Sequence, residues 1–308
     1  MDYPSAFHIS AQTPIIPTVQ SWKGFLVDQG KSIYTVKAFM ADLELLAGYL
    51  PPDRTIGQIT TKDLNNFLEW MTTARGVPCS PKTLSRRVTS IKAFFRWLHQ
   101  SGRISVDPAE KVVQKSVISP LPEVLTREEQ ERALKVVDDL RSGSKPDPRP
   151  ATLLRLLLDT GIKKRETLSI HYNHIDLDAP NGPILFVRYA SPANRYKERK
   201  IDLTDQFVEC YKEYLESYKP REVIFPWSPR RLEYLLEDIG NAAGLTKHLS
   251  FEMCRWTSAL RDLQNGVDKD EIRIKLGISK IQWREIGLKL RKLAEQQASA
   301  AATKVVKP

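Results

Sequence analysis

The stretch SPKTLSRRVTSIKAFFRWLHQ, residues 80–100, carries five Lys and Arg side chains and no acidic one. Lys82, Arg86 and Arg96 fall on one face of the helix that this stretch predicts, and a stripe of apolar residues forms the opposite face. A cationic face without acids suits a helix that follows a row of phosphates, whereas a solvated face usually mixes in Glu or Asp. We therefore predict a helix that packs by one face and binds nucleic acid by the other. The apolar stripe consists of Leu84, Val88, Ile91, Phe95 and Leu98.

Composition and charge narrow the partners of the chain. Its 308 residues include 47 Lys plus Arg against 37 Asp plus Glu, and the resulting net charge of +10 favours a polyanionic partner such as double-stranded DNA. Hydrophobic residues make up 41%, which is enough for real cores, and the length suggests about two domains. The apolar runs are shorter than the ~18 residues of a membrane span, and the N-terminus lacks the features of a secretory signal. We expect no membrane partner.

Cysteine and histidine usage argues against disulfide and metal chemistry. Cys79, Cys210 and Cys254 stand far apart, which excludes a disulfide framework and a CxxC metal site. His171 and His174 are close, but no Cys or third His accompanies them, so a zinc site is not indicated. We expect no metal, no cofactor and a reducing compartment, most simply the cytoplasm, with the protein associated with the nucleoid.

The periodic segments predict a mainly α protein. After a flexible arm over residues 1–17, apolar residues at helical spacing and capping Ser and Thr residues predict a compact helical domain over 18–112. Residues 113–125 hold two prolines and no helical period, so we interpret them as a linker. The helices of the first domain are expected at 18–29, 33–50, 62–74 and 81–100.

A capping box, Thr126 with Glu129, opens a second domain over 126–298. Short runs at 175–177, 184–189 and 199–203, separated by turn residues, predict one small antiparallel sheet. Residues 299–308 are expected to form a flexible tail. The remaining helices are expected at 126–141, 150–159, 163–171, 204–218, 228–243, 251–265, 268–276 and 279–298.

Four strings in this order resemble the tyrosine recombinase, or phage integrase, superfamily. The resemblance spans about residues 18–290. It implies a helical, SAM-like core-binding domain and a mixed α+β catalytic-type domain that clamp DNA between them. It also implies attack of a tyrosine on a DNA phosphodiester, with two arginines gripping the phosphate oxygens and a histidine and a lysine moving protons. The strings are LLLDTGIKKRETLSI (156–170), NRYKERKIDL (194–203), FEMCRWTSALRDLQNG (251–266) and IRIKLGISKIQWREIGLKL (272–290).

Carried over residue by residue, the resemblance implies a degenerate recombinase without the usual catalytic residues. One of six family positions is retained, and lysine at the first arginine position keeps the charge but loses the two-pronged fork. The positions are Lys163 for the first arginine, Asn194 for the hairpin lysine, Glu252 for the first histidine, Arg255 for the second arginine, Ile278 for the third-box His or Trp, and Gly287 for the tyrosine.

Gly287 is the decisive departure, because the last tyrosine of the chain is Tyr234 and residues 235–308 contain none. Glu252 is the second. On a helix it lies three residues from Arg255, on the same face, so we expect it to pair with Arg255 and to repel a phosphate oxygen. At ~4 Å and an effective dielectric near 20 that repulsion costs roughly 4 kcal/mol.

Several cations are candidates for DNA contact, each with a plainer alternative. Lys163 and the cations of the 194–200 hairpin could be solvated surface charges, and Arg255 could be an ion-pair partner of Glu252. Arg230 and Arg231 begin a helix that in the family lies in the major groove, where an arginine can reach guanine edges. The candidate DNA-binding residues are Lys82, Arg86, Arg96, Lys163, Arg195, Lys197, Arg230, Arg231 and Arg255.

The C-terminal helix carries Trp283, Ile286, Leu290 and Leu293 at a spacing of three and four. Such a stripe usually packs in a core or against a partner helix. In the family a C-terminal helix can dock onto a neighbouring protomer, so self-association or a recombinase partner is one interpretation.

Three functions stay open at this point. The first is a DNA-binding regulator, architectural factor or silent subunit in recombination or integration that cannot cleave DNA. The second is an active recombinase whose nucleophile is Tyr196, Tyr218, Tyr234 or a tyrosine of a partner chain. The third is a protein–protein adaptor on the same fold, against which the net charge of +10 argues.

Overall fold

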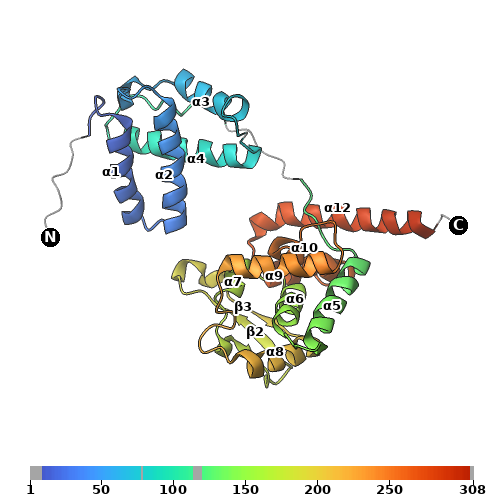
Figure 1. Ribbon diagram of the computed structural model, residues 1–308. Helices are drawn as coiled ribbons and strands as arrows, with labels where there is room; N and C mark the ends of the chain where they lie inside the picture. The colour runs from blue at the N-terminus through green and yellow to red at the C-terminus, as the bar shows by residue number, and fades with distance from the viewer. Residues whose placement is uncertain (1–8, 78, 114–119, 306–308) are drawn as a thin grey trace. The chain divides into compact units, whose positions relative to one another are not determined.

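The computed structural model describes residues 9–77, 79–113 and 120–305, with side chains up to residue 299 (Figure 1). The chain divides into two compact units, Met1–Pro120 and Leu121–Pro308, each with its own apolar core. The predicted mainly α fold, with a small antiparallel sheet in the second unit, is confirmed. None of the helices in these residues combines the length and the apolar character needed to cross a lipid bilayer.

Helices make up the described part of the first unit. The elements are α1 (Ile15–Asp28), α2 (Ile33–Tyr49), η1 (Ile56–Gln58), α3 (Thr61–Thr73) and α4 (Pro81–Gln100). Ser32, Thr60 and Ser80 each accept a hydrogen bond from a backbone N–H in the first turn of the helix that follows, which fixes where α2, α3 and α4 begin. α1 packs against α2 and α2 against α4, around Trp22 and Phe94, whose rings meet edge to face with centroids 5.3 Å apart.

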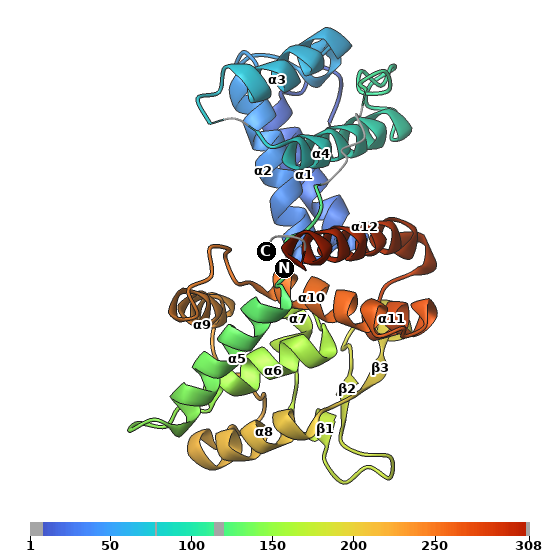
Figure 2. The ribbon, with the colours of Figure 1, turned by 90° about the vertical axis from the view of Figure 1, so that its right-hand side faces the viewer.

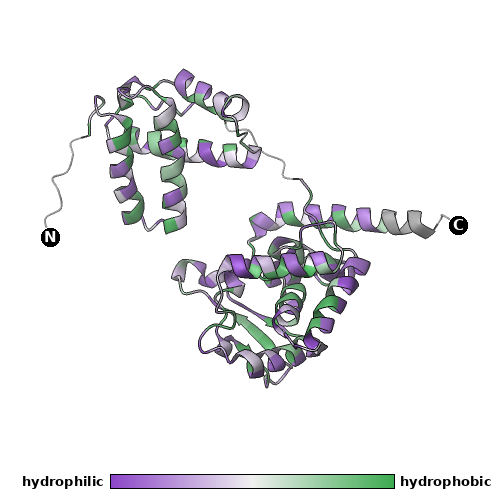
Figure 3. Ribbon diagram, viewed as in Figure 1, coloured by the Kyte–Doolittle hydropathy of each residue, from purple (hydrophilic) through white to green (hydrophobic). Residues whose placement is uncertain are grey.

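Helix α4 shows the predicted division into two faces. Lys82, Arg86 and Arg96 are exposed to solvent. The apolar stripe lies in or against the core of the unit, and Figure 3 shows the alternation of hydrophobic and hydrophilic residues along the helix. The helix and its core-facing stripe are confirmed, and the contact of its basic face with DNA stays a prediction. The stripe residues are Leu84, Val88, Ile91, Phe95 and Leu98.

The prediction of a flexible arm over residues 1–17 is wrong for residues 9–17. Ile9 and Ile15 are buried in the core of the first unit, and α1 begins at Ile15 rather than at residue 18. The backbone N–H of Gly57 donates to the carbonyl of Ala11 at 2.9 Å, and a Cβ on Gly57 would lie 2.8 Å from Ala11. Glycine therefore permits a close backbone contact that holds this segment. Residues 1–8 of the predicted arm lie outside the described residues.

Helix α6 (Arg149–Thr160) is the centre of the second unit and packs against α5 (Arg127–Ser142), α8 (Asp205–Tyr218) and α10 (Phe251–Gln264). It is surrounded on several sides, which explains why most of its residues are apolar and buried. The remaining elements are α7 (Lys164–Thr167), η2 (Tyr172–His174), β1 (Ile175–Asp176), β2 (Ile184–Val187), η3 (Pro192–Lys197), β3 (Arg199–Asp202), α9 (Pro229–Ala242), α11 (Lys269–Lys275) and α12 (Lys280–Val305).

The three strands form an antiparallel sheet in the order β1–β2–β3 (Figure 2). Its register pairs Leu185 of β2 with Ile175 of β1 and with Ile201 of β3. All three of these side chains are buried in the core of the second unit. The sheet thus presents one apolar face to the helices, and its β2–β3 connection carries the predicted hairpin cations.

The C-terminal part of the predicted linker belongs to the second unit. Val124 and Leu125 are buried there, and the Leu125 backbone N–H donates to the Thr257 hydroxyl at 2.9 Å. The linker is therefore shorter than 113–125, because the apolar residues at its end pack against α10 and its neighbours. Residues 114–119 lie outside the described residues.

Two further boundaries differ from prediction. The helix expected over 163–171 ends at Thr167, because the backbone beyond it pairs with the segment after α8: the Ile224 N–H donates to the Ile170 carbonyl at 2.8 Å. Helix α12 continues to Val305, through most of the tail expected over 299–308. The alanine-rich sequence after Gln297 has high helix propensity, which favours this continuation.

Candidate nucleic-acid interface

Arg86, on the exposed face of α4, is held by an acid from a neighbouring helix. Asp42 of α2 is 1% exposed and accepts hydrogen bonds from both terminal nitrogens of Arg86, one of them at 2.8 Å. The expectation of a basic face without a compensating acid is therefore wrong at Arg86, since the carboxylate comes from another segment. Lys82 and Arg96 have no ion-pair partner within the described residues.

Three cations of the second unit meet at the C-terminal end of α11. The carbonyl end of a helix carries a partial negative charge and unpaired acceptors, so cations placed there stabilise it. Gly277 has a φ of +57°, and a Cβ there would lie 2.6 Å from Arg199, so glycine is required for this approach. The cations thus bind the backbone of their own chain. The three bonds are Lys163 Nζ to Gly277 O at 3.0 Å, Arg199 Nε to Lys275 O at 2.7 Å, and Arg255 Nη2 to Leu276 O at 2.6 Å.

Arg255 does not pair with Glu252, so that expectation is wrong. Arg255 Nη1 donates to the Gly161 carbonyl, and the Glu252 carboxylate instead accepts from Trp256 Nε1 at 2.7 Å. Burial lowers the pKa of Arg255 to about 10, although the charge of Glu166 partly opposes this. The guanidinium therefore stays charged at neutral pH, with two of its donors already bound to carbonyls.

Glu166 of α7 forms a buried ion pair that the sequence did not indicate. Arg199 of β3 donates to both carboxylate oxygens, at 3.1 and 2.9 Å, and the two side chains are 2% and 3% exposed. The Tyr189 hydroxyl and the Lys163 backbone N–H also donate to Glu166. Burial raises the pKa of Glu166, but the bonds and charge of Arg199 outweigh it and hold the pKa at about 2. Because Arg199 also binds α11, the pair joins three separate segments.

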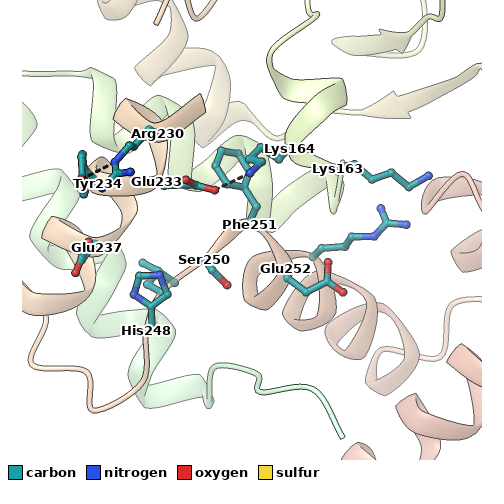
Figure 4. Close-up of a pocket in the computed structure, with 12 residues that line it drawn as sticks. Lys163, Lys164, Arg230, Glu233, Tyr234, Glu237, His248, Ser250, Phe251 and Glu252 are labelled. Atoms are coloured by element: carbon teal, nitrogen blue, oxygen red, sulfur yellow. Dashed lines mark hydrogen bonds and ion pairs between the residues drawn. The ribbon is translucent and has the colours of Figure 1, made fainter. Parts of the chain in front are cut away.

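A pocket of about 550 Å³ lies between α9 and α10. Figure 4 shows Lys163 at one end of it and Arg230 with Tyr234 at the other. Arg230 Nε donates to the Tyr234 hydroxyl at 2.7 Å, and the guanidinium lies 5.2 Å from the ring centroid. Four cationic and three acidic side chains line this pocket, so its charges nearly balance. They are Lys163, Lys164, Arg230 and Arg255 against Glu233, Glu237 and Glu252.

A second pocket of about 840 Å³ shares Lys163 and is more strongly cationic. Residues 192–197 form the 3₁₀ helix η3 rather than a strand, so Asn194 and Arg195 are not directed to opposite sides as in a strand, and both line this pocket. Lys197 Nζ donates to Asn194 Oδ1 at 2.8 Å. We call this the hairpin pocket. Four further residues line this pocket that the sequence did not predict as ligands: Arg165, Arg188, His171 and His174. The sequence contains a signal only for the two histidines, which are close to each other along the chain.

The last two family positions lie in apolar packing. Ile278 is 7% exposed and belongs to an apolar cluster formed by α10, α11 and α12. A Cβ on Gly287 would lie 3.2 Å from the ring of Trp283, one turn earlier on α12, and Gly287 lines neither of the two pockets. The stripe of α12 that starts at Trp283 packs into this same cluster, so its core interpretation is confirmed.

The three tyrosines considered as relocated nucleophiles differ in their surroundings. Tyr196 is 73% exposed on η3, and the Tyr218 hydroxyl, at the end of α8, donates to Asp147 at 3.2 Å and lines neither of the two pockets. Tyr234 lines the same pocket as Lys163 and Arg255.

Arg231 is exposed and does not line that pocket, in contrast to Arg230. The part of the chain with described side chains places no group of three His, Cys, Asp or Glu residues so that it could hold a metal ion.

The chain matches the description "Phage integrase family" over residues 123–284 and "Phage integrase, N-terminal SAM-like domain" over residues 19–102. It belongs to the phage integrase family. The resemblance inferred from the four strings is thereby confirmed. The match to the integrase domain ends before Gly287, so the tyrosine position is assigned by the residue-by-residue argument.

Curated relatives of this integrase-family chain match most of its length. Tyrosine recombinase XerD of Listeria innocua is 25% identical over 282 residues, covering 87% of this chain and 92% of the relative. Tyrosine recombinase XerC of Oceanobacillus iheyensis is 28% identical over 264 residues, covering 82% and 84%.

Solved structures show the same fold at lower identity. XerH bound to palindromic difH substrate, in a post-cleavage complex, has a TM-score of 0.76 at 15% identity and covers 98% of this chain and 99% of that one. A lambda integrase dimer bound to a COC′ core site has a TM-score of 0.69 at 17% identity, with 88% and 94% covered.

Proposed function

We propose that this integrase-family protein binds double-stranded DNA without cleaving it, as a regulator, architectural factor or silent subunit in DNA recombination or integration. The fold is shared with XerH and lambda integrase, whose structures were solved on DNA. The net charge of +10 and the cationic pockets suit a polyanion. The observation that carries the loss of cleavage is Gly287, packed against Trp283 in a segment without tyrosine.

Binding and cleavage make different demands on the residues. Binding needs cations at the surface, and Lys82, Arg96 and the hairpin pocket supply them. Cleavage needs a nucleophile and donors aimed at the non-bridging oxygens of the transition state. Two N–H donors of Arg255 are already bound to backbone carbonyls, and at position 252 this chain has a glutamate where the family has a histidine. Neither residue thus meets the demands of cleavage.

The first test combines an affinity measurement with a trapping assay. Fluorescence anisotropy of a labelled duplex is expected to show log K falling with log salt, with a slope of about −0.9 per phosphate contacted. A nicked suicide substrate is expected to give no denaturant-stable adduct. A salt-insensitive affinity, or no binding at low ionic strength, would refute the DNA-binding function and favour the adaptor; a covalent adduct would refute the loss of cleavage.

A second candidate function, an active recombinase with a relocated nucleophile, is favoured by the position of Tyr234. This tyrosine lines the same pocket as Lys163 and Arg255, and its hydroxyl is bonded to Arg230. If it acts, the suicide substrate traps an adduct that disappears in Tyr234→Phe and persists in the matched control Tyr196→Phe. An adduct that survives both substitutions would exclude both tyrosines.

We also propose self-association through α12. Ile281 and Leu288 are 78% and 53% exposed and stand seven residues apart, two turns along one side of the helix. The lambda integrase structure named above is a dimer on DNA, which supports a second copy of the chain as the occupant. Leu288→Glu is expected to shift the protein toward the monomer in analytical ultracentrifugation, whereas Gln206→Glu, at an exposed position of α8, adds the same charge away from this surface and serves as the control. An unchanged sedimentation profile for Leu288→Glu would reject this surface.

A further inference from the structure

The hairpin pocket has an excess of positive charge that its own acids do not neutralise. Five Lys and Arg side chains line it against two carboxylates, and its volume is about 840 Å³. It is formed by α7, η2 and the connection from β2 to β3. The charged and titratable lining residues are Lys163, Arg165, Glu166, His171, His174, Arg188, Tyr189, Arg195, Lys197 and Glu198.

Both carboxylates of the pocket already have partners. Glu166 is bound to Arg199, which is not among the lining residues, and to the Tyr189 hydroxyl. Glu198 accepts the backbone N–H of Tyr189 at 2.9 Å. Glu166 also lies 3.7 Å from Lys163 Nζ, so part of its charge offsets that lysine. Two carboxylates cannot offset five cations, so the pocket keeps a net positive charge.

Arg188 and Arg195 are the two arginines of the pocket that can offer their planar forks to a ligand. Arg188 lies 5.3 Å from the ring centroid of Phe186, and neither Arg188 nor Arg195 has an ion-pair partner among the described residues. An arginine fork binds two oxygens of one phosphate in parallel, which makes it the preferred side chain for this group. Lys197 adds a point charge, steadied by its bond to Asn194.

A histidine pair completes the lining. His174 Nδ1 accepts the backbone N–H of His171 at 3.3 Å, and the two rings meet edge to face with centroids 5.2 Å apart. This bond leaves Nε2 of the neutral His174 ring as a donor. Burial, His171 and Arg188 lower the pKa of His174, whereas Glu198 opposes them, so the ring is neutral at pH 7 in the absence of an anion.

We propose that the hairpin pocket binds a phosphate group through Arg188, Arg195 and Lys197, and that binding draws a proton onto His174. The proposal rests on the DNA-binding function, under which the phosphate belongs to the DNA backbone. Lys163 lines both pockets, so a backbone held here continues toward the pocket between α9 and α10. A negative charge beside His174 favours the charged imidazolium, and by linkage the affinity rises as the pH falls.

The binding test compares two arginine substitutions in the full chain. Arg188→Gln is expected to weaken duplex binding about tenfold, the effect of losing one charge-assisted contact, and to make the slope of log K against log salt less negative by about 0.9. Arg221→Gln, an exposed arginine outside both pockets, is the matched control and is expected to leave affinity and slope unchanged. If the two variants bind alike, the pocket holds no phosphate although DNA binding stands. If the wild type binds no duplex, the proposed function fails instead.

The proton test uses NMR titration of the histidine rings, with His174→Gln to assign the signals. Duplex DNA is expected to raise the pKa of His174, and the affinity of the wild type is expected to rise about threefold from pH 8 to pH 6. His174→Gln removes this pH dependence, whereas His248→Gln, in the other pocket, retains it. A pH dependence that survives His174→Gln would overturn the proton linkage. If inorganic phosphate alone, and not the duplex, shifts the His174 signal, the ligand is a free phosphate and the assignment to the DNA backbone is overturned.

Discussion

Replacing Glu166 with glutamine tests the junction of α7, β3 and α11. The side chains of Glu166 and Arg199 are 3% and 2% exposed, so solvent screens their interaction little. The pKa of Glu166 falls from 4.5 to about 2 on folding, which by linkage corresponds to roughly 3 kcal/mol of stability. We therefore expect Glu166→Gln to lower the free energy of unfolding of the second unit by about 3 kcal/mol at pH 7.

The pH dependence gives this prediction its sign. The folded pKa lies below the unfolded value, so the contribution is complete above pH 4.5 and is lost as the pH falls from there toward 2. The difference between wild type and Glu166→Gln should therefore shrink between pH 5 and pH 3. Urea unfolding, read by hydrogen exchange and mass spectrometry of peptides from α6, reports on the second unit alone.

An exposed ion pair in the same unit supplies the control. Arg127 and Glu131 lie 3.1 Å apart on α5 with side chains 90% and 64% exposed, and such a pair contributes about 0–1 kcal/mol. Glu131→Gln should therefore change the stability little at any pH. The buried pair has no such role in stability if Glu166→Gln is no more destabilising than Glu131→Gln, or if its effect is the same at pH 3 as at pH 7.

Three further predictions concern the candidate interface. Arg96→Glu should weaken duplex binding without changing the melting temperature, whereas Arg86→Glu should also lower the melting temperature, because it sets a second carboxylate against Asp42. Anisotropy measures the binding and calorimetry the melting temperature, and an unchanged melting temperature for Arg86→Glu would disprove its pairing with Asp42. Gly287→Tyr should trap no adduct on a nicked suicide substrate, since its Cβ meets Trp283 and no family histidine is restored; a covalent product would contradict this. Tyr234→Phe removes the hydroxyl that orients Arg230 and should weaken binding of the preferred duplex by up to about 1–3 kcal/mol relative to a duplex substituted at one base pair. Competition with substituted duplexes measures this discrimination, and equal preferences in both proteins would reject this role.

The fold was predictable wherever local sequence signals and packing agree. The cap Ser32 and the apolar stripe of α4 located two helices of the first unit from sequence, because both signals act within a few residues. For α3 the sequence offered Thr60 or Thr61 as the cap, and the structure has Thr60. The arm was mispredicted because the burial of Ile9 depends on residues far along the chain. The linker over 113–125 was predicted too long for a related reason. Its prolines indicate that the segment is not helical, but they do not indicate that it is unpacked.

The site was less predictable, because the partners of a charge are set by tertiary structure. Arg86 looked unpaired since residues 80–100 contain no acid, yet Asp42 lies 44 residues earlier in sequence. The signal was present: Asp42 interrupts the apolar face of the 33–50 helix, next to Leu43, and a carboxylate on a buried face requires a partner. The Glu252–Arg255 pair was predicted from helical spacing alone. In the structure the Arg255 guanidinium instead donates to the carbonyls of Gly161 and Leu276, which belong to two other segments.

The cations of this chain therefore divide into two groups with different consequences for mutation. Lys163 and Arg255 bind carbonyls around α11, so removing either leaves buried acceptors unpaired, at about 1–3 kcal/mol each, and lowers stability along with any DNA affinity. Within the part of the chain that the structure describes, Arg96 and Arg188 make no such bonds to carbonyls, so their loss is expected to report on binding. Under the proposed function, Lys163 and Arg255 are kept because folding needs them, whether or not a nucleophile is present. Retained charge at Arg255 is thus compatible with a protein that has lost the chemistry for which the family uses that arginine.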